Sequence, residues 1–314
     1  MNVVTAGKRI KQSIPAVAAA LMLAGCSFNT AQPPSNAEAL RQADPDNGKA
    51  SDRSAKDTAD GVVVSERIYL DPAWEWADLS AIDTGFSVLY KASHDRKDVI
   101  VAVNAGHGTK GGEDKSVYCH PDGSPKITDG TNPAGSLTAV AISLGMIFND
   151  GTYESDAALQ TARILRDELL DDGYDVLMIR DSRNINLDNV ARTVIANNMA
   201  ACLISLHFDD DGLTYDKGCF FVPTPDEIKE MDPVKAVWQE HDRLGNALID
   251  GLRDSGCTIY EGFIYPQELT QTCYSRIPAV VMELGNATTK HDDASLLRYA
   301  RGLCDGVEKY LDRL

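Results

Sequence analysis

From residue 99 onward, apolar residues follow two alternating patterns, short continuous runs and longer stripes with helical spacing. Continuous apolar runs of a few residues are typical of strands that are buried on both faces of a sheet. Such runs occur at 99–103, 176–179, 202–206, 220–222 and 279–282. Apolar residues spaced three and four positions apart predict helices with one buried face. We expect these helices at 156–171, 187–200, 234–252 and 293–311.

The order of these elements indicates the fold class. Strands that alternate with helices form mostly parallel sheets, because each helix crosses over the sheet before the next strand begins. Gly173, directly after the first helical stripe, supports a helix end there, since glycine commonly follows the last helical residue. We therefore predict an α/β fold, a sandwich of helices around a mostly parallel sheet.

Residues 1–25 predict a signal peptide. Three basic residues at 8–11 precede an almost wholly apolar or small stretch at 14–25, which is short for a transmembrane helix but suits a signal sequence. The stretch ends in Leu-Ala-Gly-Cys at 23–26, which resembles the lipobox of bacterial lipoproteins. This resemblance implies that Cys26 is lipidated and becomes the first mature residue, and two acyl chains suffice for stable membrane anchoring.

A flexible tether is expected to follow the lipidated cysteine. Residues 26–61 are rich in Ser, Asn, Asp and Lys and contain few large apolar residues, so burial cannot offset the entropy of the chain. Bulky residues, including Trp74 and Trp76, return from residue 62. We expect 62–97 to be an ordered lead-in packed on the main domain, although its aromatic side chains could instead line a substrate groove.

Composition and charge exclude several classes of protein. The chain has 314 residues, of which 43% are hydrophobic and 25% charged, which excludes a wholly disordered chain, a collagen and a polytopic membrane protein. The formal net charge of −17 argues against nucleic acid as a partner. Apart from Cys26, six cysteines remain, and an extracellular location permits several disulfide pairings. Cys202, within an apolar run, is expected to be a buried small hydrophobe.

Residues that can bind a metal or transfer a proton follow three of the predicted strands. His107, His207 and Glu283 stand at the ends of the first, third and last long apolar runs. Glu154 precedes the first helix and could reach the same edge of the sheet, where sites of α/β proteins form. Two imidazoles and one carboxylate form a known catalytic zinc set with one open position, and a further carboxylate could act as general base and acid.

Two other histidines have less specific surroundings. His120 could offer a further metal ligand, but we expect it to lie in a surface loop. His241, within a charged helix, is expected to face solvent.

The set and order of these motifs resemble the amidase-3 type of zinc-dependent N-acetylmuramoyl-L-alanine amidases. The resemblance covers roughly 98–314. It rests on the following residues: Gly-His-Gly at 106–108, Glu154 at a helix start, Arg180, Asn-Val-Ala-Arg at 189–192 with Asn197, Ser-Leu-His at 205–207, and Pro-Ala-Val-Val-Met-Glu-Leu-Gly at 278–285.

This resemblance implies a three-layer α/β/α sandwich with a sheet of about six strands. It implies that His107, Glu154 and His207 bind Zn²⁺ and that Glu283 is the catalytic carboxylate, which accepts a proton from the attacking water and passes it to the leaving amine. The substrate implied is peptidoglycan, cut at the amide between the lactyl group of N-acetylmuramic acid and L-alanine. The site of action implied is the cell envelope.

Relative to the family, residues 113–150 form an inserted segment, which could cover the site as a lid or only decorate the surface. Two other functions stay open from the sequence. One is a non-catalytic peptidoglycan-binding lipoprotein, and the other is a zinc peptidase or amidohydrolase that acts on small peptides, since substrate choice depends on loops. The sequence identifies no activating protein.

Overall fold

The structure, a computed structural model, describes residues 65–312. The predicted signal peptide at 1–25, Cys26 and the predicted tether to residue 61 lie outside the described residues. Within 65–312, no helix has both the length and the apolar character needed to span a bilayer.

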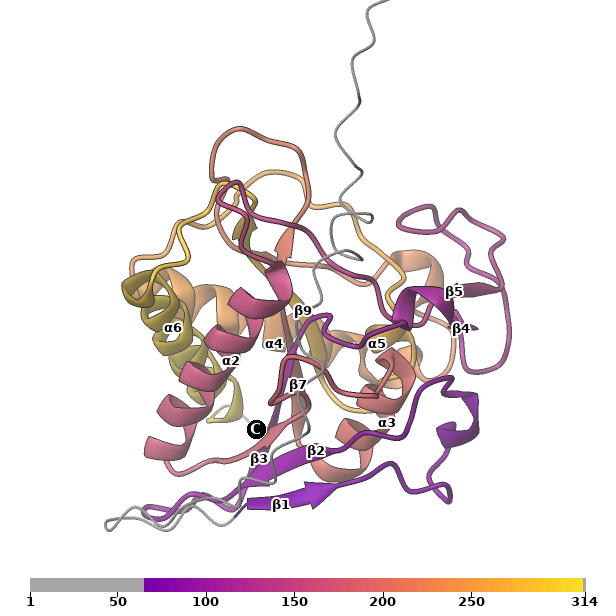
Figure 1. Ribbon diagram of the computed structural model, residues 1–314, viewed down its shortest axis with the longest axis horizontal. Coiled ribbons are helices and arrows are strands. Elements are labelled where there is room, and N and C mark those ends of the chain that lie inside the picture. The colour runs from indigo at the N-terminus through magenta and orange to yellow at the C-terminus, as the bar shows by residue number, and fades with distance from the viewer. Residues whose placement is uncertain (1–64, 313–314) are drawn as a thin grey trace, which may run out of the picture. The chain divides into compact units, whose positions relative to one another are not determined.

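A seven-stranded mixed sheet forms the centre, with the strand order β1-β2-β6-β3-β7-β9-β8 (Figure 1). The strands are β1 (Ser65–Ile68), β2 (Ser87–Tyr90), β3 (Ile100–Ala105), β6 (Asp175–Met178), β7 (Cys202–Asp209), β8 (Phe220–Phe221) and β9 (Ala279–Asn286). The central strands β6, β3, β7 and β9 run parallel, as the apolar runs predict.

The outer strands correct the prediction of a mostly parallel, roughly six-stranded sheet. β1 and β2 extend one edge and β8 extends the other, and each pairs antiparallel with its neighbour. The apolar run at 220–222 predicts β8, but β1 and β2 are short and partly exposed and lack the continuous apolar run by which a buried strand is found. The lead-in therefore adds strands to the sheet in addition to packing on it.

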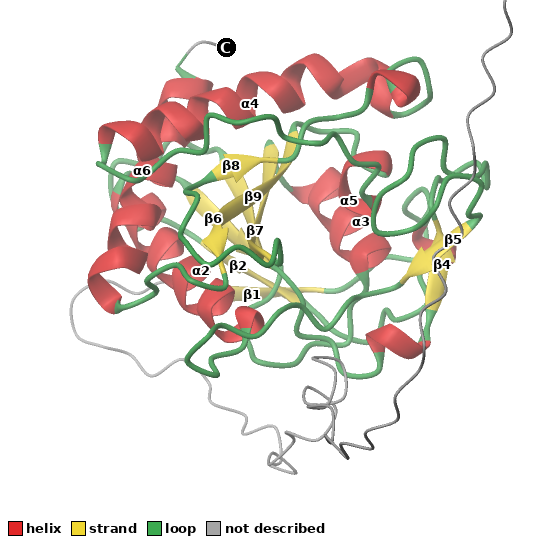
Figure 2. Ribbon diagram, turned by 90° about the horizontal axis from the view of Figure 1, so that it is seen from above, coloured by secondary structure: helices red, strands yellow, loops and turns green. Residues whose placement is uncertain are grey.

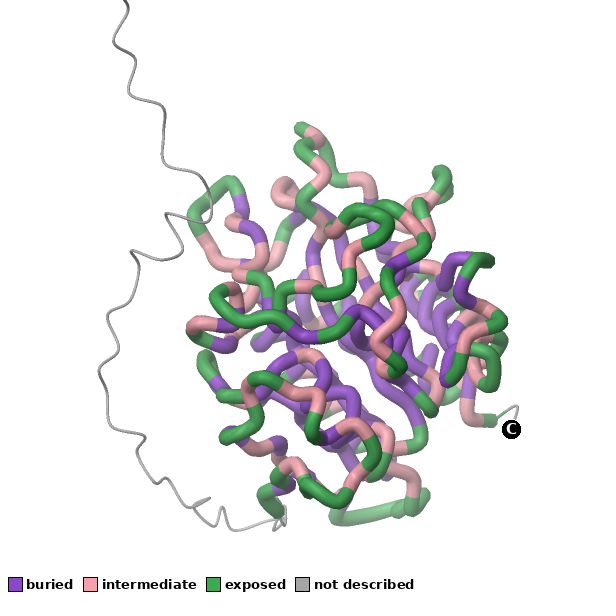
Figure 3. Tube along the Cα trace, turned by 90° about the vertical axis from the view of Figure 1, so that its right-hand side faces the viewer, coloured by how far each residue is buried: buried purple, intermediate pink, exposed green. Residues whose placement is uncertain are grey.

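Helices cover both faces of the sheet, which confirms the three-layer prediction (Figure 2). One layer comprises α2 (Glu154–Asp171), α4 (Val234–Asp254) and α6 (Asp293–Leu311), and the other comprises α3 (Asn189–Met199) and the short α5 (Thr270–Cys273). The largest apolar cluster joins the first layer to β3, β6, β7 and β9. A second cluster joins α3 to the opposite face. Buried residues accordingly concentrate in the sheet and on the inner sides of the helices (Figure 3).

The remaining elements lie in connecting segments. Three 3₁₀ helices span Ala77–Leu79, Gly112–Asp114 and Asp226–Ile228. In the inserted segment, β4 (Ser116–Tyr118) and β5 (Thr138–Val140) form a separate antiparallel pair. All six cysteines within 65–312 are buried and free, and Cys202 lies in β7 as a buried residue.

His241 of α4 is buried, so the prediction that it faces solvent is wrong. Its Nδ1 accepts a hydrogen bond of 2.9 Å from the backbone N–H of Ala279. Burial lowers the pKa of this imidazole to about 4. The ring is therefore a neutral part of the core at neutral pH, joining α4 to β9.

The buried histidine predicts an acid-sensitive contribution to stability. An unfolded histidine has a pKa of about 6.5, so between pH 6.5 and pH 4 the unfolded chain binds the proton that folded His241 excludes. This contribution is complete above pH 6.5, and about 2 kcal/mol of it should be lost between pH 7 and pH 5. Denaturant unfolding at both pH values should therefore show a smaller loss for His241→Asn than for the wild type. Equal losses would contradict this assignment.

Candidate metal centre

The side chains of His107, Glu154 and His207 converge at the carboxyl end of the central strands. His107 follows β3, Glu154 is the first residue of α2, and His207 lies near the end of β7. Nε2 of His107 lies 2.8 Å from Oε1 of Glu154, and Nδ1 of His207 lies 3.1 Å from the same oxygen. The two ring nitrogens are 3.0 Å apart. Three residues from distant parts of the sequence thus form one cluster that could hold a metal ion.

The cluster fits zinc in both its chemistry and its spacing. Imidazole nitrogen and carboxylate oxygen are common zinc ligands, and atoms that share one tetrahedral zinc stand about 3.3 Å apart. Two glycines leave room for these side chains. A Cβ on Gly106 would overlap the His207 ring, and a Cβ on Gly145 would lie 2.7 Å from Oε2 of Glu154. Side chains larger than glycine at these positions would therefore displace the cluster.

Hydrogen bonds set the direction of two side chains in the cluster, His107 and Glu154. Nδ1 of His107 lies 2.9 Å from the carbonyl oxygen of Ser143, and since that oxygen can only accept, Nδ1 carries the proton. Nε2 of His107 therefore presents its lone pair to the cluster. Oε2 of Glu154 accepts a bond of 2.9 Å from the N–H of Met146, and Oε1 accepts one of 3.1 Å from that of Phe208.

Two buried arginines hold the turn that carries His107. Arg180 donates to the carbonyl oxygens of Ala105 and Gly106 at 3.0 and 2.9 Å. Arg192 donates to the carbonyl oxygen of His107 at 2.6 Å. His107 has a φ of 62°, in the left-handed region, so these bonds hold a backbone conformation that is unfavourable for a residue with a side chain. Both arginines are among the residues that carry the family resemblance in the sequence, but only the structure shows what they contact.

Glu154 and His207 have the protonation states that metal binding requires. Burial alone would raise the pKa of Glu154, but the charges and hydrogen bonds of His107 and His207 outweigh it and hold that pKa well below its ordinary value. Burial lowers the pKa of His207, against the effect of its hydrogen bond with Glu154. At neutral pH the site therefore offers a carboxylate together with a neutral imidazole at position 207.

Glu283 lies beside this cluster. It is the register partner of His207 in the parallel pair of β7 and β9, so the two residues are neighbours across the sheet. Its Oε2 is buried and has no hydrogen-bond partner within the described part of the chain. Burial raises the pKa of the carboxyl well above its usual range, and the charge of Glu154 adds to this effect. A carboxyl group with a raised pKa is suited to accepting and donating a proton at neutral pH.

A polar network that the sequence did not reveal borders Glu283. Lys217 forms ion pairs with Asp209 and Asp211, the latter at 2.9 Å. Asn286, at the end of β9, donates from its side-chain amide to Asp211 and to the carbonyl oxygen of Tyr215. The network fixes the loop after β7 against the end of β9. The three successive aspartates at 209–211 were the available signal, since a nearby cation favours the ionised form of such a group of like charges.

His120 is buried, so the prediction that it lies on the surface is wrong. Its Nε2 lies 2.7 Å from Oε2 of Glu268, whose side chain is also buried. The inserted segment packs against the residues before α5, and this packing buries both His120 and Glu268. His120 is not a member of the cluster of His107, Glu154 and His207.

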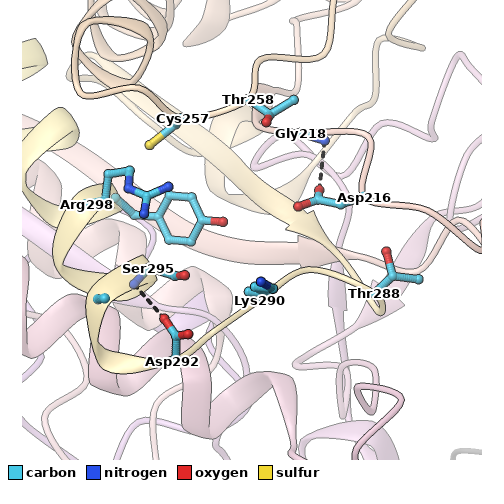
Figure 4. A pocket seen from close by; sticks show the side chains of 11 residues that line it. Asp216, Gly218, Cys257, Thr258, Thr288, Lys290, Asp292, Ser295 and Arg298 are labelled. Carbon is cyan, nitrogen blue, oxygen red and sulfur yellow. Dashed lines mark hydrogen bonds between the residues drawn. The ribbon is translucent and has the colours of Figure 1, made fainter.

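A cavity of about 390 Å³ lies apart from the cluster (Figure 4). Asp216, Cys257, Lys290 and Arg298 are among the residues that line it, close to the start of α6. None of the three cluster residues lines it, and neither does Glu283. The cavity is therefore separate from the candidate site.

Comparisons with known proteins agree with this arrangement. A family model described as N-acetylmuramoyl-L-alanine amidase matches residues 101–302. The apo structure of the N-acetylmuramyl-L-alanine amidase Ami1 from Mycobacterium abscessus is 23% identical, with a TM-score of 0.55, over 68% of this chain and 99% of that one. Ami1 from Mycobacterium smegmatis is 20% identical, with a TM-score of 0.56, over 69% and 98%. These two structures share the fold. No curated protein matches the sequence.

Proposed function

Because the chain belongs to the family of N-acetylmuramoyl-L-alanine amidases, which matches residues 101–302, we propose that His107, Glu154 and His207 bind zinc in its active site. The enzyme is a hydrolase of peptidoglycan that acts outside the cytoplasm, in the cell envelope. The observation that carries the zinc proposal is the convergence of three metal-binding atoms within 2.8–3.1 Å of one another. Two imidazole nitrogens and one carboxylate oxygen support zinc over ions that prefer oxygen ligands alone.

The proposed reaction is hydrolysis of the amide between the lactyl group of N-acetylmuramic acid and L-alanine. Zinc, when bound, supplies a Lewis acid that favours ionisation of water and polarises a carbonyl group. Glu283 accepts the proton of the attacking water and then donates it to the leaving amine. The raised pKa of Glu283 suits both steps, because such a group holds the proton after accepting it and releases it to a more basic amine.

The two other functions considered from the sequence have less support. A non-catalytic binding lipoprotein would not require the ligand cluster and a buried acid–base carboxyl side by side. A peptidase for small peptides would use the same metal chemistry, but membership of the amidase family favours the muramoyl amide.

We also propose that the enzyme is attached to the membrane by a lipid on Cys26. The basic and apolar pattern of residues 1–25 and the Leu-Ala-Gly-Cys motif support removal of a signal peptide and lipidation. Residues 26–61 would form the tether, followed by the lead-in at 62–97 and the catalytic domain at 98–314. A tether of this length would let the domain reach peptidoglycan away from the membrane surface.

Digestion of purified cell-wall sacculi tests the proposed activity. We expect the enzyme to release stem peptides and to create new L-alanine amino termini, detected by mass spectrometry and amino-terminal labelling. Plain peptides of the same stem sequence, without the muramoyl group, should remain intact. Binding to sacculi without release of products would favour the non-catalytic alternative, and cleavage of the plain peptides would favour the peptidase.

A further inference from the structure

We propose that residues 141–146 of the inserted segment are a positioning element of the metal centre, so that the insertion is neither a lid nor a surface decoration. This inference rests on the proposed function, since it concerns the residues assigned there to zinc. It adds that Ser143, Gly145 and Met146, which offer no metal-binding side chain, determine where His107 and Glu154 stand.

The first part of the argument is that the segment contacts the two ligands directly. The carbonyl oxygen of Ser143 accepts a hydrogen bond from Nδ1 of His107, and the N–H of Met146 donates one to Oε2 of Glu154. The Ser143 hydroxyl lies 3.1 Å from the same Nδ1. The proposed ligand atoms are the other ring nitrogen, Nε2 of His107, and the other carboxylate oxygen, Oε1 of Glu154. Both atoms face the cluster. Hydrogen bonds of this kind orient ligands in metal sites, and their loss typically weakens metal binding 10- to 100-fold.

The second part is the close fit at Gly145. This residue has a φ of 83°, and a Cβ there would lie 2.7 Å both from Oε2 of Glu154 and from Cδ2 of His107. The backbone of the segment therefore lies directly against both ligands. Any side chain at this position must displace the carboxylate, the imidazole or the segment itself.

The third part is that the segment is itself held in place. Ala141 and Ile142 donate backbone hydrogen bonds to Lys115 and Gly112, next to the β4–β5 pair. Earlier in the insertion, the Ile127 N–H and the Thr128 hydroxyl donate hydrogen bonds to the buried carboxylate of Glu268, which also pairs with His120. These bonds join the insertion to the chain before α5. The segment that supports the ligands is thus held at its start, and the part of the insertion before it is joined to the rest of the domain.

Gly145→Ala tests the proposal, with Gly135→Ala as its matched control. Gly135 lies in the same insertion and has a φ of 85°, but a Cβ there would meet no atom within 4 Å. Both substitutions thus impose the same backbone strain, and only one affects the ligands. In the full-length protein, chelator competition should show zinc affinity reduced 10- to 100-fold for Gly145→Ala and little changed for Gly135→Ala. When Co²⁺ replaces zinc, the visible spectrum of Gly145→Ala should differ from that of the wild type, and the spectrum of Gly135→Ala should match it.

Equal zinc affinities and equal Co²⁺ spectra for the two variants would overturn the proposal. If Gly145→Ala does not fold, Glu268→Gln decides, with the exposed Glu261→Gln on the same segment as its control. The proposal is supported if zinc affinity is reduced in Glu268→Gln but not in Glu261→Gln. Equal zinc affinities of these two variants refute it. The wild type separates this result from the function proposed above: a wild type that binds no zinc refutes the zinc site, whereas a zinc-binding wild type with unaffected variants refutes only the positioning role.

Discussion

Replacement of Glu283 by glutamine is expected to lower the rate of peptidoglycan cleavage by about 10²- to 10⁴-fold, the usual contribution of general acid–base catalysis. Glutamine has nearly the same shape but cannot accept the proton of the attacking water. The three proposed zinc ligands are unchanged in this variant, so zinc content should stay at about one ion per chain. Timed release of stem peptides from sacculi measures the rate, and metal analysis of the same sample measures the zinc.

The exposed Glu261 provides the control for this substitution. Glu261→Gln removes the same charge from a surface segment and should leave the rate unchanged. Normal cleavage by Glu283→Gln would show that another group transfers the proton. Loss of zinc together with activity would show that Glu283 acts mainly on the metal centre.

Replacement of Glu154 by glutamine is expected to abolish both zinc binding and activity. Its carboxylate lies between the two imidazoles, and it supplies the only negative charge among the three ligand groups. Loss of a ligand should weaken zinc binding by more than the roughly 100-fold that loss of a supporting hydrogen bond can cause. Chelator competition measures the affinity, and the sacculus assay measures the activity.

Glu168, on the same helix α2, provides the control for the ligand substitution. Its side chain contacts Arg301 at a partly exposed position, far along the helix from Glu154. Glu168→Gln should retain zinc and activity. Zinc binding by Glu154→Gln at wild-type affinity would remove Glu154 from the ligand set.

The central sheet could be predicted from the sequence because strands buried on both faces require continuous apolar runs. Strands β1 and β2 at one edge could not, since β1 is mostly exposed and β2 alternates between buried and half-buried residues. The burial of His241 follows from the spacing of apolar residues in α4. His241 lies seven residues from both Val234 and Leu248, on the buried face of α4. Helical spacing is therefore a better guide to its burial than the charge of the residues next to it in sequence.

The candidate site was predictable to the extent that strand ends mark it. His107 follows β3, and His207 and Glu283 lie towards the carboxyl ends of β7 and β9, strands that the sequence defines well. The support for the site was not predictable, because Ser143 and Met146 act through backbone groups that every residue possesses. The burial of His120 could not be predicted for a related reason, because it depends on Glu268, which lies 148 positions away in the sequence.

Anomalous diffraction at the zinc absorption edge, from crystals of the zinc-loaded protein, tests the central claim most directly. We expect one strong peak, about 2.0–2.2 Å from Nε2 of His107, Oε1 of Glu154 and Nδ1 of His207. A zinc peak bound by other residues, or no peak within bonding distance of these three atoms, would contradict the proposed metal centre.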